Sequence, residues 1–221
     1  MNADAEHLHR ELARLGAATV YEASGRRGLI DVELIQIIPG SRACGPARTV
    51  RCGQDDNLMV HAVMTHVQPG EVLVLTMPEP RAVALLGDLL ATQARVAGAA
   101  AVLIDASVRD RSELEAMELP IWTRWVRSRG AAKSEVGQLD VPVSIGGQEI
   151  RPGDLVVLDA DGGTVVGAER AEEVLAVSQE REEQEFRKRR QLQAGLHSYD
   201  LDGLRAIVEG DRQPRAGDER S

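Results

Sequence analysis

Aromatic residues are scarce in this chain, with two Trp, two Tyr and one Phe among 221 residues. Apolar residues nevertheless make up 43% of the sequence, so a hydrophobic core has to be built mainly from Ala, Val, Leu and Ile. The length fits one sizeable domain better than two. We therefore expect a single domain over residues 1–208, followed by a disordered polar tail over residues 209–221.

Cysteines and long apolar runs are also few. Cys44 and Cys52 cannot make a disulfide framework and are expected to be small, reduced core residues. The N-terminal segment MNADAEHLHRELARLG is charged and helical in pattern, and it lacks the apolar stretch of a signal peptide. No apolar run approaches the roughly 20 residues that span a bilayer. We therefore expect no membrane association and a cytoplasmic location.

Positive charge is in deficit. The chain has 26 Lys and Arg against 35 Asp and Glu, which gives a formal net charge of −9. A surface this negative repels nucleic-acid phosphates, so a broad DNA- or RNA-binding face is not expected.

The hydrophobic periodicity predicts an α/β fold, because strands and helices alternate through the middle of the chain. Helices are expected over residues 2–15, 58–67, 88–97, 113–117 and 169–193. Strands are expected over residues 35–38, 48–52, 71–76, 100–105, 141–144, 155–158 and 164–166, and another begins at 120–122. Residues 15–31 and 39–46 carry Gly and Pro turn signals and are predicted to be loops.

One helix and the strand after it define a candidate binding edge. The helix over residues 88–97 should be roughly 15 Å long, and the strand over residues 100–105 should run back about 20 Å. The start of the helix and the end of the strand therefore meet at one edge of the sheet, where open α/β sheets bind ligands. Three free amides at the helix start suit a carboxylate or phosphate: those of Asp88, Leu89 and Leu90, just after Gly87.

Two further side chains follow the strand at this edge. Arg109 can grip a carboxylate or a 2-oxo oxygen with two donors. Asp110 and Asp88 can hold a hard cation directly or through water, and a site with so few carboxylates suits Mg²⁺, with Mn²⁺ as the usual substitute. An Arg–Asp pair after a strand is also common on surfaces, and an acidic residue in the first turn of a helix is favourable without any function. Spacing alone leaves both interpretations open.

Five segments resemble one enzyme family: ATVYEASGRRGL, DDNLMVHAVMTHVQPGEVLVL, LGDLLATQARVAGAAAVLIDASVRD, IRPGDLVVLDADGGTVV and REEQEFRKRRQLQAG. They resemble class II pyruvate aldolases of the 4-hydroxy-4-methyl-2-oxoglutarate and 4-carboxy-4-hydroxy-2-oxoadipate type, which share a fold with the regulator of ribonuclease activity A. The resemblance covers most of residues 15–200. GDLL with the later VRD is fairly specific to this superfamily, but it does not separate enzyme from regulator.

The resemblance implies a single-domain layered α/β sandwich of the swivelling β/β/α type with a long C-terminal helix. It implies a lyase that cleaves a 4-hydroxy-2-oxo acid to pyruvate and a second oxo acid, with oxaloacetate decarboxylation as a second activity. It also implies a homotrimer or homohexamer with sites between subunits. Glu185 on the C-terminal helix of the next subunit would then complete the site, with Glu182 as the fallback.

The resemblance also implies a role for each residue at the predicted edge. Asp110 would be the direct protein ligand of Mg²⁺ or Mn²⁺, and Asp88 would hold a metal-bound water. Arg109 would contact the keto oxygen and stabilise an enolate. The backbone amides after Gly87 would receive the carboxylate of the pyruvyl group.

Departures from the family pattern bear on the substrate more than on the reaction type, and two rival functions stay open. The segment MPEPRAVALL before Gly87 and the Ala at 106 differ from the usual family residues, which leaves the substrate undefined. A non-catalytic regulator of ribonuclease activity is the main rival, because the acidic charge is compatible with binding a basic protein. The REEQE sequence of the last helix favours the aldolase. A related lyase or decarboxylase of a specialised pathway is the second rival.

The histidines and lysines are not assigned to the predicted site. His61 and His66 are five residues apart on one helix, so they cannot form an i, i+4 metal pair, and we expect structural or surface roles for both. Neither of the two lysines, Lys133 and Lys188, is expected at the sheet edge. The sequence therefore predicts chemistry without a Schiff base.

Overall fold

The computed structural model describes residues 3–210. The chain divides after Gln179 into two compact units, and each unit is described separately. The tail predicted over residues 209–221 lies almost entirely outside the described residues, and the single domain over residues 1–208 stays a prediction. No helix among residues 3–210 is long and apolar enough to span a membrane.

A mixed sheet of nine strands forms the centre of the first unit, within the described part of the chain. The strands are β1 (Ile35–Gln36), β2 (Ala43–Arg51), β3 (Val72–Thr76), β4 (Ala84–Leu86), β5 (Ala101–Val108), β6 (Ile121–Val126), β7 (Gln138–Leu139), β10 (Leu155–Asp159) and β11 (Gly162–Val166). The middle of the sheet is parallel, in the order β6–β5–β3–β2. The antiparallel strand β1 lies beside β6, and β10 and then β11 lie beside β2. These strands confirm the predicted α/β class.

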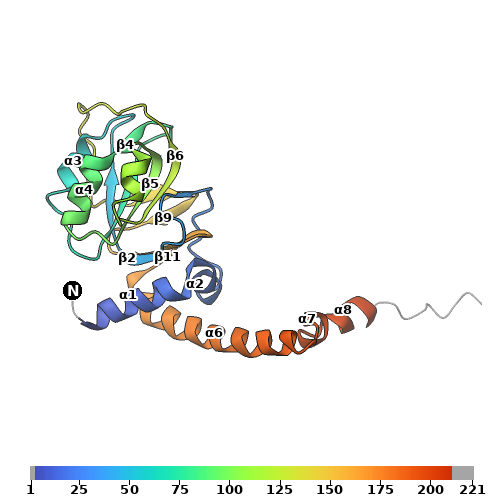
Figure 1. The fold of residues 1–221 in the computed structure, drawn as a ribbon. Coiled ribbons are helices and arrows are strands. Elements are labelled where there is room, and N and C mark those ends of the chain that lie inside the picture. Colours follow the sequence, from blue (N-terminus) through green and yellow to red (C-terminus); the bar gives the residue numbers. More distant parts are fainter. Residues whose placement is uncertain (1–2, 211–221) are drawn as a thin grey trace, which may run out of the picture. The chain divides into compact units, whose positions relative to one another are not determined.

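Three helices cover one face of the parallel strands (Figure 1): α3 (Leu58–Val63), α4 (Asp88–Val96) and α5 (Arg111–Glu115). Side chains alternate along a strand, so Leu73 and Leu75 of β3 point to this face while Val72 and Val74 point to the other. All four side chains are fully buried. Each contributes about 1.5–3 kcal/mol by leaving water, which offsets the scarcity of aromatic residues.

The opposite face of the parallel strands packs against the hairpin of β8 (Val143–Ile145) and β9 (Gln148–Ile150) and against side chains of β10 and β11, which continue the same sheet. Trp122 is the largest fully buried side chain on this face. Its indole Nε1 donates a hydrogen bond to the carbonyl of Asp159 at 2.8 Å. A buried Trp needs such an acceptor, so this bond fixes the ring in the core.

A third apolar cluster lies between β10, β11 and the helices α1 (Ala3–Leu15), α2 (Ala17–Ala23) and the start of α6 (Ala171–Gln193). Cys44 belongs to this cluster and Cys52 to the cluster under α3 and α4. Both thiols are free and buried, as predicted. Burial raises the pKa of the Cys52 thiol to about 12, so it stays protonated at neutral pH.

The prediction of loops over residues 15–31 and 39–46 is wrong in part. Residues 17–23 form α2, because the carboxylate of Asp159 accepts a hydrogen bond from the Ala17 amide at 2.9 Å and so satisfies the start of the helix. Residues 43–46 belong to β2 and pair with β10. Both elements depend on partners more than 100 residues later in the sequence, which local turn signals do not reveal.

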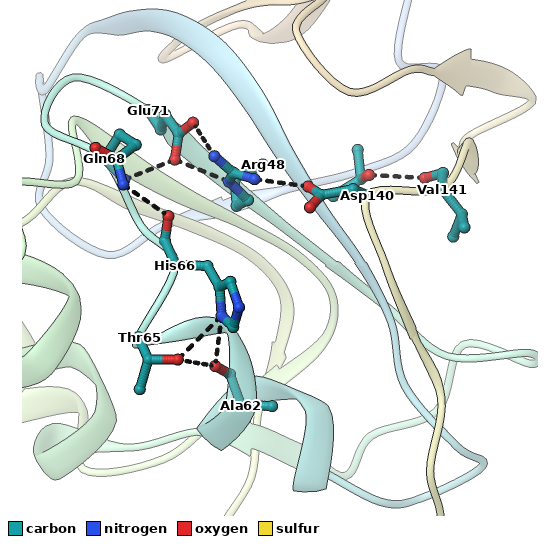
Figure 2. Close-up of polar contacts among 9 residues, drawn as sticks. Arg48, Ala62, Thr65, His66, Gln68, Glu71, Asp140 and Val141 are labelled. Atoms are coloured by element: carbon teal, nitrogen blue, oxygen red, sulfur yellow. Dashed lines mark hydrogen bonds and ion pairs between the residues drawn. The ribbon is translucent and has the colours of Figure 1, made fainter.

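A polar network on the same unit ties the start of β3 to β2 (Figure 2). The Arg48 guanidinium binds both carboxylate oxygens of Glu71, at 3.0 and 2.7 Å, and also Asp140 at 2.8 Å. His66 lies nearby, with its Nδ1 3.0 Å from the Thr65 hydroxyl and 3.2 Å from the Ala62 carbonyl. His66 therefore has the structural role expected from the sequence.

The described part of the second unit, residues 180–210, contains the rest of α6 followed by α7 (Ser198–Leu201) and α8 (Leu204–Gly210). The long helix ends at Gln193 as predicted and begins at Ala171, after a short 3₁₀ turn at Ala168–Arg170. Ion pairs spaced four residues apart lie along its polar surface, and Lys188 pairs with Asp202 at 2.6 Å. Such pairs stabilise a helix that has few apolar residues.

Candidate functional site

The start of α4 and the end of β5 meet at one edge of the sheet, as predicted. The strand runs to Val108, three residues further than expected, because β4 pairs with its last residues. The Arg109 amide then donates to the Leu86 carbonyl at 3.1 Å. This bond places the residues after β5 directly beside the residues before α4.

The side-chain carboxylate of Asp110 points towards the start of α4. Its Oδ2 accepts a hydrogen bond from the Asp88 amide at 3.2 Å and lies 3.4 Å from the Arg109 Nε. The backbone of Asp110 is left-handed, with φ of 60°. Non-glycine residues seldom adopt this conformation, and those that do are often found at functional sites.

Gly87 makes the close approach of these groups possible. A Cβ at this position would lie 2.5 Å from the Asp110 Oδ2 and 3.1 Å from the Arg109 Nε. No side chain fits in that space. The Asp88 amide is taken by Asp110, so the amides of Leu89 and Leu90 remain, and neither has a hydrogen-bond acceptor within residues 3–210. They are free donors at the positive end of a helix, which favours an anion.

A cavity of about 110 Å³ opens at this edge. Its lining includes every residue predicted to bind substrate, and the full set is Asn57, His61, Ala84, Gly87, Asp88, Leu89, Leu90, Arg109, Ala131 and Lys133. The volume is well below the 300 Å³ or more that is typical of sites for drug-sized ligands. It is therefore suited to a small acid.

Two further side chains in the lining, an imidazole and an ammonium group, were not predicted there. His61, expected to be structural or on the surface, reaches the cavity from α3, and Lys133 reaches it from the segment 129–135. The prediction that both lysines lie away from the site is therefore wrong for Lys133. The helix start at Asp55–Asn57 could have indicated that His61 is near this edge, whereas no periodic signal marks the segment that carries Lys133.

The carboxylates available for a metal are few. No group of three His, Cys, Asp or Glu side chains within residues 3–210 is arranged to hold a metal ion. The first unit offers Asp88 in the cavity lining, and Asp110 beside that lining, where it accepts the hydrogen bond from the Asp88 amide. Mg²⁺ commonly keeps several waters and takes only one or two protein carboxylates, so this donor set fits it. Glu185 belongs to the second unit, where it pairs with Arg181 at 3.0 Å.

The family model described as RraA-like, Aldolase/RraA, matches residues 17–166 of the chain. The chain belongs to the RraA-like family. It is 35% identical over 165 residues to a Halalkalibacterium halodurans protein named "Putative 4-hydroxy-4-methyl-2-oxoglutarate aldolase", covering 75% of this chain and 76% of that protein. These matches confirm the predicted family, and the family includes aldolases.

Two solved RraA structures have the same fold. One is Streptomyces coelicolor RraAS2, described as an unusual member of the RNase ES inhibitor RraA family, with 32% identity, a TM-score of 0.73, and coverage of 83% of this chain and 96% of that one. The other is the RNA-processing inhibitor RraA from Thermus thermophilis, with 28% identity, a TM-score of 0.57, and coverage of 63% and 83%. They confirm the predicted RraA-like α/β fold with its long C-terminal helix.

Proposed function

We propose that this member of the RraA-like family is a divalent-metal-dependent lyase that cleaves a 4-hydroxy-2-oxo acid to pyruvate and a second oxo acid. The observation that carries the proposal is the cavity at the start of α4. There, Arg109 and the free amides of Leu89 and Leu90 lie beside the carboxylates of Asp88 and Asp110. The name of the Halalkalibacterium halodurans relative supports the same chemistry.

The metal in this proposal is Mg²⁺ or Mn²⁺, with Asp110 as its direct ligand and Asp88 bound through water. When bound, such an ion supplies Lewis acidity at the 2-oxo group. Glu185 from a neighbouring subunit of a homotrimer or homohexamer would add a further carboxylate. The left-handed backbone of Asp110 and its bond from the Asp88 amide keep the proposed ligand in place.

The protein side chains would then carry out the bond cleavage. The C4 hydroxyl loses its proton to a carboxylate, for which Asp88 is in the cavity lining and Glu185 is the second candidate. The C3–C4 bond breaks, C4 becomes the carbonyl carbon of the second oxo acid, and the bonding electrons form the enolate of pyruvate. Arg109 stabilises the enolate oxygen, the amides of Leu89 and Leu90 hold the carboxylate, and protonation at C3 gives pyruvate.

The positively charged side chains of the cavity favour a substrate with a second carboxylate. Lys133 and Arg109 line the cavity together with the imidazole of His61, whereas Asp88 is the one acidic side chain in the lining. An excess of positive charge in a small cavity favours a di- or tricarboxylic acid over a neutral aldol. 4-Hydroxy-4-methyl-2-oxoglutarate and 4-carboxy-4-hydroxy-2-oxoadipate both meet this condition, and so does oxaloacetate as a substrate for decarboxylation.

A coupled assay tests the function directly. The protein is incubated with 4-hydroxy-4-methyl-2-oxoglutarate or oxaloacetate and Mg²⁺, and pyruvate is measured with lactate dehydrogenase. We expect pyruvate release that stops when EDTA is added and returns with excess Mg²⁺ or Mn²⁺. Borohydride added during turnover should not trap Lys133 as a pyruvyl adduct, because the proposed reaction forms no Schiff base.

A regulatory role is the second candidate, because both RraA structures are named as inhibitors of RNase activity or RNA processing. Absence of pyruvate release from either substrate, with any of these metals, would contradict the lyase and favour this alternative. Release that is unaffected by EDTA would contradict the role of the metal. A trapped Lys133 adduct would replace the proposed chemistry with a Schiff-base mechanism.

A further inference from the structure

Asp56 is a buried carboxylate that joins two separate segments of the cavity wall. It is 1% exposed. Its Oδ1 accepts a hydrogen bond from the Leu58 amide at 2.7 Å. Its Oδ2 accepts from the Ser134 amide at 2.6 Å, the Ser134 hydroxyl at 3.2 Å and the Glu135 amide at 3.0 Å. The two oxygens thus hold two parts of the chain that are more than 70 residues apart in sequence.

The carboxylate is charged in the folded protein. Burial alone would raise the pKa of Asp56, but the four hydrogen bonds outweigh it and hold this pKa below its usual value. A lowered pKa stabilises the folded state above about pH 4, and this contribution is lost as the pH falls through the folded-state pKa. At neutral pH, Asp56 therefore acts as a fixed negative acceptor between the two segments.

Each segment held by Asp56 carries one side chain of the cavity lining. Leu58 is the first residue of α3, which carries His61 into the lining. Ser134 follows Lys133, which also lines the cavity. One carboxylate therefore anchors the backbone of both segments that carry these side chains.

Backbone bonds continue this connection towards Arg109. Asp56 forms a parallel bridge with Ala132, and Ala84 forms another with Gly130. A Cβ on Gly130 would lie 3.1 Å from the Arg109 Nη1, so this backbone packs against the guanidinium. The segment 129–135 is thus a fixed wall of the cavity, and Asp56 is its only charged anchor among the bonds described above.

We infer that Asp56 is a positioning residue that sets substrate selectivity by fixing Lys133 and His61 relative to Arg109. It touches no substrate and acts through these side chains. The inference rests on the proposed function, and it assigns Asp56 to recognition of the carboxylate distant from the pyruvyl group. The pyruvyl half is held by α4 and Arg109, which Asp56 does not contact.

The test compares Asp56→Asn with Asp159→Asn in the full-length protein. Asparagine keeps the size of the side chain but turns one oxygen into a donor that faces backbone N–H donors. Asp159 is a matched control, because it is 7% exposed and accepts bonds from the Ala17 and Asp161 amides at 2.9 Å each, away from the cavity lining.

Two reactions distinguish recognition of the whole substrate from recognition of its pyruvyl half. The first is cleavage of 4-hydroxy-4-methyl-2-oxoglutarate, and the second is exchange of the pyruvate methyl protons in D₂O, followed by NMR. For Asp56→Asn, we expect the KM for cleavage to rise about 10-fold or more, since displaced supporting residues cost about that much. We expect pyruvate exchange to change less than about threefold, because it needs only the pyruvyl half. Asp159→Asn should change neither the KM for cleavage nor the rate of pyruvate exchange.

A double variant shows whether Asp56 acts through Lys133. Lys133→Met alone should raise the KM for cleavage. Asp56→Asn introduced into the Lys133→Met variant should then raise this KM by much less than Asp56→Asn does in the wild-type protein. Fully additive effects, an unchanged KM in Asp56→Asn, or equal losses of cleavage and pyruvate exchange would each overturn the inference. A wild-type protein that performs neither reaction would instead contradict the proposed function.

Discussion

Replacing Asp110 with asparagine is expected to reduce metal-dependent pyruvate release at least about 1000-fold. An amide is a poor ligand for Mg²⁺ in comparison with a carboxylate. Asparagine is the informative substitution because it tolerates the left-handed conformation, with φ of 60°, that Asp110 adopts. Alanine would add backbone strain to the loss of the metal ligand, so a loss of activity could come either from lower folding stability or from lost metal binding.

The matched control for this variant is Asp140→Asn. Asp140 is also left-handed, with φ of 53°, but it binds Arg48 in the middle of β2, and neither residue is in the cavity lining. We expect its pyruvate release to equal that of the wild type. Both variants should melt within a few degrees of the wild type, because each loses about one hydrogen bond or ion pair. Pyruvate release by Asp110→Asn at the wild-type rate would exclude Asp110 as the metal ligand.

Gly87→Ala is expected to be nearly as damaging, at about 100-fold or more in kcat/KM, although it removes no functional group. The new Cβ would lie 2.5 Å from the Asp110 Oδ2 and 3.2 Å from the Arg109 Cγ. Real contacts of this kind are not that short, so the carboxylate, the guanidinium or the start of α4 must move. Steady-state assays with oxaloacetate and Mg²⁺ measure the loss.

Alanine substitutions at two other glycines serve as controls for the effect of an added methyl group on activity. At Gly130, a Cβ would meet the far end of the flexible Arg109 side chain at 3.1 Å, so Gly130→Ala should cost less than about 10-fold. At Gly210, a Cβ would have no atom within 4 Å, and the substitution should be silent. Equal activity in the Gly87 and Gly210 variants would mean that the close approach at α4 has no part in catalysis.

The candidate site could be predicted from the sequence where it depends on neighbouring elements. The α4 helix and the β5 strand are consecutive in the chain. The expected lengths of the helix and the strand therefore predict that Arg109 and Asp110 lie beside Gly87, and they lie there in the structure. The bond from the Asp88 amide to Asp110 could not be predicted, because it depends on the left-handed backbone of Asp110. That bond leaves two free amides for a substrate instead of the three expected.

The other wall of the cavity could not be predicted in this way. Lys133 comes from an irregular segment, and its position depends on the buried carboxylate of Asp56 and on isolated backbone bridges. Helix α2 was missed for a similar reason, because its first amide is satisfied by Asp159, which lies 142 residues later. Contacts of this kind leave no periodic pattern in the sequence.

The most direct test of the central claim is calorimetric binding of oxalate, a planar mimic of the pyruvate enolate, with and without Mg²⁺. If a divalent ion held by Asp110 shares the cavity with Arg109 and the α4 amides, oxalate should bind in the presence of Mg²⁺. That binding should disappear with EDTA and in Asp110→Asn. Oxalate binding of equal strength without metal, or in Asp110→Asn with metal, would contradict the claim.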